Sequence, residues 1–387
     1  MADLEGEVGR AAALPVADRA GRAWLWSCVA LTIGALVAAV ELAPPVGAPP
    51  TAALSWLLFT GSSVDVASTW WLFTVPEVRA YGRAHPARCI WIPLTLVAAG
   101  AAAAASVPPA TFAWLLPAYF GWQLFHYGKQ NVGMAALAAS AQRVRPASKA
   151  ERWPMLWTSG AAIVAVVTRP GLLGLHLQLG AWSTAPGGHL TALESAAHVA
   201  TAAAFAVAAA TGVTALARRP RAERRAGFAV TYFTSLLFPL PVFVFASPYA
   251  ALGGMTVAHG AQYLLLVTMV AATDRGASTR PARYMRPARL ALLANIALIG
   301  GIALSTASHL HDAGPAGRAL FGAYIGAVMG HFVIDAGLWR MRDPLARRFL
   351  SIHLPYLTPS KPDPGGTARN LNSAPADRSS ADIECSL

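Results

Sequence analysis

Long apolar runs recur along almost the whole chain, separated by short polar connections. Each run approaches or exceeds the length that a helix needs to cross a hydrocarbon layer of roughly 30 Å at about 1.5 Å per residue. Such runs lie near residues 23–43, 52–75, 89–107, 110–134, 153–169, 192–216, 227–247, 250–272, 289–308 and 318–339. Because a helix satisfies its own backbone hydrogen bonds inside lipid, this pattern predicts an all-α, polytopic integral membrane bundle of about ten transmembrane helices.

Composition agrees with this prediction. The chain has 387 residues, of which 55% are hydrophobic and only 12% are charged. A net charge of +12 is also a feature of nucleic-acid-binding proteins, but here the arginines stand in short segments between apolar runs. We therefore expect the lipid bilayer as partner and no nucleic acid, and the sequence predicts no particular oligomeric state.

The basic residues predict a topology because they concentrate in every second connection. The even-numbered connections contain Arg79, Arg83 and Arg88; Arg143, Arg145, Lys149 and Arg152; Arg218, Arg219, Arg221, Arg224 and Arg225; and Arg275, Arg280, Arg283, Arg286 and Arg289. The odd-numbered connections contain only Arg169 and Arg318. By the positive-inside rule, the even connections and both termini are cytoplasmic, and we expect a multi-pass protein of the plasma membrane.

The same pattern divides the chain into four segments. Residues 1–22 contain several acidic groups and no apolar core, so we predict a cytoplasmic N-terminal segment rather than a secretory signal. Residues 23–340 form the predicted transmembrane domain, and 341–358 a cytoplasmic juxtamembrane segment. Residues 359–387 are rich in Pro, Gly, Ser, Asp and Asn, which is typical of a disordered tail.

Glycine and proline predict local features of three runs. Gly322, Gly326 and Gly330 repeat a small residue at every fourth position, which predicts close approach of a neighbouring backbone to the tenth span. Pro239 and Pro241 should kink the seventh span. The fourth run is longer than one crossing needs, so we expect it to bend or to extend into the cytoplasm.

Ionisable side chains occur inside several predicted spans, although each costs roughly 2.5–3.5 kcal/mol on insertion scales when placed centrally. They are Asp65 in span two, His126 in span four, Glu194 and His198 in span six, His259 in span eight, and His331 and Asp335 in span ten. All of these spans are even-numbered and run in the same direction. Counted from the outer boundary at about 1.5 Å per residue, several of these groups reach a similar depth near the midplane.

This pattern predicts a transition-metal site, with iron or copper as the expected ion. His126, His259 and His331 are the predicted ligands, because imidazole binds iron, copper and zinc and because bundle sites are assembled from inward-facing side chains of several helices. Asp65 and Asp335 are expected to complete or orient the site and to act in catalysis. The residues predicted to line a substrate site are Trp122, Gln130, Gln262, Tyr263 and Tyr324.

Our leading interpretation is a metal-dependent oxidoreductase that admits a lipophilic small molecule laterally from the bilayer. The chain lacks the closely spaced HxxxH and HxxHH boxes of membrane desaturases. Lone histidines on several spans are similar in kind to membrane carotenoid-cleaving oxygenases with a histidine-held iron, although no motif matches residue by residue. The alternatives are a proton-coupled transporter that uses the same Asp and His residues, a haem protein, and purely structural contacts between helices.

Overall fold

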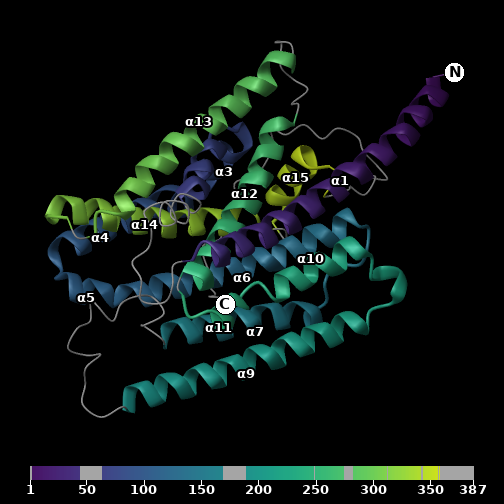
Figure 1. The fold of residues 1–387 in the computed structure, drawn as a ribbon. Coiled ribbons are helices and arrows are strands. Elements are labelled where there is room, and N and C mark those ends of the chain that lie inside the picture. The colour runs from purple at the N-terminus through teal and green to yellow at the C-terminus, as the bar shows by residue number, and fades with distance from the viewer. Residues whose placement is uncertain are drawn as a thin grey trace, which may run out of the picture.

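The computed structural model describes residues 2–43, 63–168, 189–247, 249–273, 282–311, 313–340, 343–355 and 357, and the predicted tail 359–387 lies outside them. Within these ranges the chain is helical and contains no β-strand (Figure 1). The longer helices are α1 (Ala2–Glu41), α4 (Ile92–Ser106), α6 (Leu115–Ala141), α7 (Lys149–Val167), α9 (His189–Ala217), α10 (Ala226–Leu236), α12 (Gly254–Ala272), α13 (Ala282–Ser308) and α14 (Pro315–Leu338). Shorter helical elements are residues 63–72, α3 (Pro76–Ala84), the π-helical turns Ala87–Trp91 and Tyr249–Gly253, α5 (Pro109–Ala113), the 3-10 turn Arg221–Glu223, α11 (Pro241–Val244) and α15 (Pro344–His353).

Six of the described helices are long and apolar enough to cross a membrane. They comprise Arg19–Glu41, Ala87–Ser106, Leu193–Ala217, Ala250–Ala272, Met285–Ser308 and Pro315–Leu338. A helical membrane bundle therefore fits the structure. The count of about ten spans, the cytoplasmic termini and the plasma-membrane location stay predictions.

Two predicted spans are interrupted. The fourth run forms α5, turns at Trp114 and continues as α6, which extends to Ala141 and so beyond the predicted end of that run. The seventh run ends as α10 at Leu236 and restarts as α11 at Pro241. The predicted kink is confirmed as a complete break, because proline lacks the N–H that would continue the helical hydrogen-bond ladder.

The closest helix packing in the described part of the chain is between α14 and α4 (Figure 1). A Cβ atom added at Gly322 would collide with the carbonyl group of Gly100. One added at Gly326 would collide with the carbonyl group of Leu96. The predicted close approach to the tenth span is therefore confirmed, and its partner is α4.

The even-numbered connections gather at one end of the bundle. A hydrophobic cluster there joins residues from many helix ends, including Trp24, Val78, Met155, Leu216, Phe228, Ala271, Leu338 and Leu350. Ion pairs join the fourth and sixth connections, with Arg145 Nε 3.2 Å from Glu223 Oε2. The hydroxyl of Thr273 donates a hydrogen bond of 2.7 Å to the carbonyl of His353, which joins the end of α12 to α15. The described residues at the ends of connections two, four, six and eight thus lie together, which agrees with the arrangement that the positive-inside rule predicts.

Candidate metal centre

Four helical segments each place an ionisable side chain at one buried point between them. Asp65 comes from residues 63–72, His126 from α6, His259 from α12 and His331 from α14, and all four are buried. Asp335 lies one helical turn after His331 on the same face of α14 and is also buried. The predicted convergence of these five residues is therefore what the fold produces.

The three histidines form a compact group. Each offers a ring nitrogen, and the three nitrogens lie within 4.8 Å of one another. The ring of His126 lies 5.0 Å from the ring of His259 and 5.8 Å from that of His331, measured between centroids. Among the described residues, the buried His126 Nε2 has no hydrogen-bond or ion-pair partner, whereas the Nε2 atoms of His259 and His331 face carboxylates. Unpartnered buried nitrogen is costly, so this group has the properties expected of a ligand set.

Two carboxylates complete the cluster. Asp65 Oδ2 lies 3.0 Å from His259 Nε2 and 3.4 Å from His331 Nε2. Asp335 Oδ2 lies 3.6 Å from His331 Nε2. Within the described chain, Asp65 Oδ1 and Asp335 Oδ2 also lack hydrogen-bond partners. A cation between the imidazoles and carboxylates would supply the partner that His126 Nε2 lacks and would take the place of the ion pairs between histidine and aspartate.

A chain of hydrogen bonds leads from His331 back to Asp335. Thr69 Oγ1 lies 2.7 Å from His331 Nδ1 and 2.7 Å from the hydroxyl of Tyr263. The Tyr263 hydroxyl in turn donates to Asp335 Oδ1 at 3.0 Å. An ionised carboxylate only accepts, so Tyr263 must accept from Thr69, and Thr69 must accept from His331. The proton of a neutral His331 is then on Nδ1, which leaves Nε2 with a free lone pair facing the cluster.

Aromatic rings enclose the cluster. Phe332 stacks on His126 with ring centroids 4.3 Å apart and an interplanar angle of 22°. Tyr127 packs on His259 at 4.4 Å. Tyr263 meets the ring of His331 edge-on at 5.3 Å. These contacts fix the imidazole planes and keep water away, which strengthens electrostatic interactions inside.

The predicted lining residues have different surroundings. Gln130 Nε2 donates to Gln262 Oε1 at 3.1 Å, and Gln262 Nε2 donates to Thr32 Oγ1 at 2.6 Å, so the two amides join α6, α12 and α1. Tyr263 contacts His331 directly, as described above. Tyr324 is buried in the hydrophobic cluster that contains Phe332, and Trp122 is 37% exposed on α6. A substrate-lining role for these residues stays a prediction.

Two further histidines, His198 on α9 and His311 between α13 and α14, lie apart from the centre. His198 stacks on Phe243 of α11 with ring centroids 6.2 Å apart, and His311 packs edge-on against Phe321 at 5.7 Å. Neither belongs to the group of metal-competent side chains found among the described residues.

Thr69 is the residue that sequence reasoning missed. Threonine is common in membrane helices, where it usually bonds its own backbone, so its presence alone indicates nothing. The available signal was its spacing, because Thr69 stands four positions after Asp65 and hence on the same helix face.

Thr69→Val is expected to weaken metal binding by about 10- to 100-fold, because the loss of its hydroxyl releases the tautomer and the orientation of His331. Thr69→Ser is the matched control, since it keeps the hydroxyl and should keep wild-type affinity. Competition with a chelator of known affinity measures the change. Equal metal affinity of the Val and Ser variants would contradict the positioning role of Thr69.

Comparison of the chain with protein-family models, with characterised proteins and with solved structures finds no match.

Proposed function

We propose that this protein is a membrane-embedded, metal-dependent oxidoreductase that acts on a lipophilic substrate, with His126, His259 and His331 as ligands of one transition-metal ion. The observation that carries this proposal is the group of three imidazole nitrogens within 4.8 Å of one another, beside two carboxylates and with the buried His126 Nε2 lacking any partner in the described chain. Ordinary helix-to-helix contacts predict the opposite, because buried polar atoms are normally paired.

Charge balance supports a divalent cation. Three neutral imidazoles leave the full charge of such an ion in a region of low dielectric, where an uncompensated charge is expensive. Asp65 and Asp335 supply two negative charges within 3.6 Å of the His331 Nε2 atom. Ion and carboxylates together are then neutral, as burial requires.

The ligand set favours a redox-active metal ion over a haem. Imidazole and carboxylate together suit iron, copper and zinc. A porphyrin needs a flat slot between two axial ligands, whereas Asp65 Oδ2 lies within 3.4 Å of the Nε2 atoms of both His259 and His331. Iron or copper would supply redox chemistry that none of the protein side chains provides by itself.

The residues of the chain have separate roles in this proposal. Asp65 balances charge and accepts protons from His259 or His331 when the metal ion is absent. Thr69 and Tyr263 hold His331 in the tautomer that presents Nε2. Asp335 terminates the hydrogen-bond chain and can take up or release a proton during turnover. The aromatic rings of Phe332 and Tyr127 exclude water from the reacting centre.

A lipophilic substrate follows from the position of the cluster. Its ligands come from α6, α12 and α14, and α12 and α14 are themselves long and apolar enough to span a bilayer. A molecule that reaches this centre therefore leaves a hydrocarbon environment and meets aromatic walls. A soluble, highly charged substrate would have to lose its hydration first.

Proton-coupled transport is the second candidate, favoured by one observation. The chain His331, Thr69, Tyr263 and Asp335 is continuous at hydrogen-bond distances, and such chains also conduct protons in transporters. In that case Asp65 and the histidines would exchange protons without a metal ion.

Elemental analysis with an absorption spectrum distinguishes the two candidates. We expect detergent-purified wild-type protein to retain iron or copper at a fixed number of ions per polypeptide. A His126/His259/His331 triple alanine variant is expected to retain none. A folded wild-type protein without metal would overturn the proposal and direct attention to transport. Proton-gradient-driven solute uptake by proteoliposomes, abolished by Asp65→Asn, would then be the expected result.

A further inference from the structure

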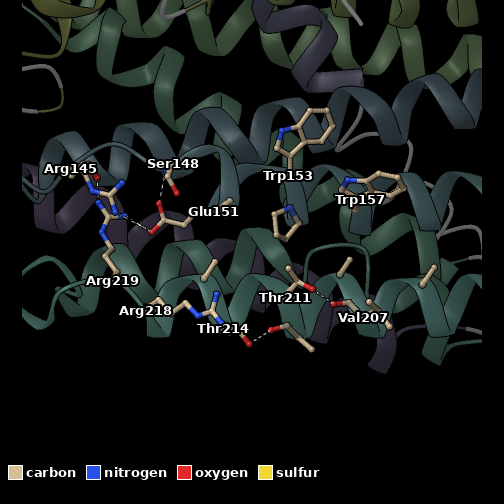
Figure 2. A pocket seen from close by; sticks show the side chains of 16 residues that line it. Arg145, Ser148, Glu151, Trp153, Trp157, Val207, Thr211, Thr214, Arg218 and Arg219 are labelled. Carbon is tan, nitrogen blue, oxygen red and sulfur yellow. Dashed lines mark hydrogen bonds and ion pairs between the residues drawn. The ribbon is translucent and has the colours of Figure 1, made fainter.

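A long groove runs between α7 and α9, away from the metal centre (Figure 2). Its volume is about 1100 Å³. Both walls are single helix faces, and α9 belongs to the helices that are able to span a membrane. The groove therefore opens towards the lipid that surrounds the bundle.

The lining of the groove changes from charged to apolar along its length. Arg145, Arg219, Glu151 and Ser148 gather at one end, where connections four and six meet (Figure 2). Trp153 and Trp157 lie farther along α7, and the facing side of α9 is built from small residues. These are Ala204, Val207, Ala208, Ala210, Thr211, Thr214 and Ala215. A molecule with one charged end and one long apolar end would match this distribution of side chains.

The arginines at the charged end differ in how fully they are paired. Arg219 is completely buried and lies 3.2 Å from Glu151 and 3.1 Å from Glu223. Its guanidinium also covers the ring of Phe228 at 4.2 Å. Arg219 therefore holds the two connections together and has little capacity for a ligand.

Arg218 is available for a ligand, whereas Arg145 is partly occupied by ion pairs with Glu223 and Glu151. Arg218 is exposed and makes no side-chain hydrogen bond or ion pair with any residue that the structure describes. The Arg145 side chain is 47% exposed, and Glu223 holds its Nε at 3.2 Å. Three arginines, Arg145, Arg218 and Arg219, stand against two glutamates, Glu151 and Glu223, which leaves one net positive charge at this end of the groove. An anionic group is the complementary occupant.

The groove has the length of one membrane leaflet. Along α9 its lining extends from Ala204 to Arg218, which at about 1.5 Å per residue corresponds to about 21 Å. Half of a bilayer, with its headgroup region, measures about 20–22 Å. The arginines then lie at headgroup level and the apolar end reaches the midplane.

We infer that this groove is a binding site for an anionic phospholipid, with the headgroup phosphate on Arg218 and Arg145 and an acyl chain along Trp153 and Trp157. The positive-inside topology places this lipid in the cytoplasmic leaflet. Trp153 and Trp157 are 55% and 65% exposed, so their rings offer the acyl chain a large apolar surface. A free phosphate would use the arginines and leave the apolar part of the lining without a role.

Native mass spectrometry of delipidated protein tests this inference, with phosphatidylglycerol, phosphatidylcholine and inorganic phosphate as separate probes. We expect wild-type protein to retain phosphatidylglycerol in preference to phosphatidylcholine and to retain no inorganic phosphate. Arg218→Gln should reduce phosphatidylglycerol affinity by about tenfold, because a charge-assisted hydrogen bond to the phosphate is lost. It should weaken phosphatidylcholine less, because the choline cation of that lipid already offsets its phosphate charge. Trp157→Ala should weaken both lipids.

Arg221→Gln is the matched control, because Arg221 is an equally exposed arginine three positions along the chain and does not line the groove. It should bind phosphatidylglycerol as wild type does. Equal retention of the two lipids by wild-type protein would overturn the inference, as would equal effects of the two arginine substitutions. The inference would also be overturned if the protein retained inorganic phosphate but no lipid, or if it appeared as a lipid-free dimer. Metal content is independent of these outcomes.

Discussion

Replacing His331 with alanine is expected to remove the metal ion from the purified protein while the helices stay folded. His331 is the residue on which most of the site depends, because its Nε2 faces both carboxylates and its Nδ1 begins the hydrogen-bond chain through Thr69. A ligand set reduced to two imidazoles loses most of its affinity, since each ligand contributes to a joint binding free energy. Elemental analysis per polypeptide should fall from about one ion to none.

The control for this experiment is His198→Ala, which removes another histidine from a membrane-spanning helix. His198 stacks on Phe243 and does not belong to the cluster. This variant should keep the full metal content. Circular dichroism should show the same helix content in both variants. A His331→Ala protein that retains its metal ion would show that the ion is held elsewhere, and the proposed ligand set would be wrong.

Gly326→Ala is expected to cause a large loss of stability although it adds only one methyl group. A Cβ atom at Gly326 would overlap the carbonyl group of Leu96 and the Cα atom of Val97, which are backbone atoms. A side chain could relieve such an overlap by changing its rotamer, but helix backbone cannot. The helices α4 and α14 must therefore separate over several turns. We expect a loss of about 3 kcal/mol or more in the free energy of unfolding, at the upper end of typical overpacking costs.

Thermal unfolding in detergent measures this loss, with Gly133→Ala as its matched control. Gly133 also lies within a long helix, α6, but an added Cβ atom there would meet no atom within 4 Å. Because alanine favours the helix over glycine by up to about 1 kcal/mol, this control should unfold at the wild-type temperature or above it. Equal midpoints for the two variants would contradict the close packing of α4 and α14.

The sequence was sufficient to predict the central part of the candidate site. Charged residues are so costly in lipid that His126, His259 and His331 had to face inward, and their similar depth on spans running in the same direction brought them together. The glycine repeat of α14 likewise predicted a close backbone contact. The depth of a side chain along its span and the spacing of small residues can each be read from the sequence of one helix at a time.

What escaped prediction depends on which helices are neighbours. Gly100 is the partner of Gly322, yet it stands beside a run of five alanines that gives no signal of contact. The position of the break at Trp114 falls within residues 112–122, which are apolar on both sides of it. The hydrogen bonds of Thr69 to Tyr263 and His331 join residues 194 and 262 positions apart. Such pairings arise only when the whole bundle is assembled.

The contact between α4 and α14 also bears on how the proposed metal centre could be redesigned. His331 and Asp335 lie on the face of α14 that is opposite to the glycines contacting α4. Because this contact is so close, α4 and α14 should move as one rigid unit that fixes the positions of these two side chains. A rigid unit cannot adapt its ligand geometry to each ion, and geometry is how proteins select among similar metals. Attempts to change the metal preference should therefore vary residues of α4 that touch no ligand, before altering any histidine.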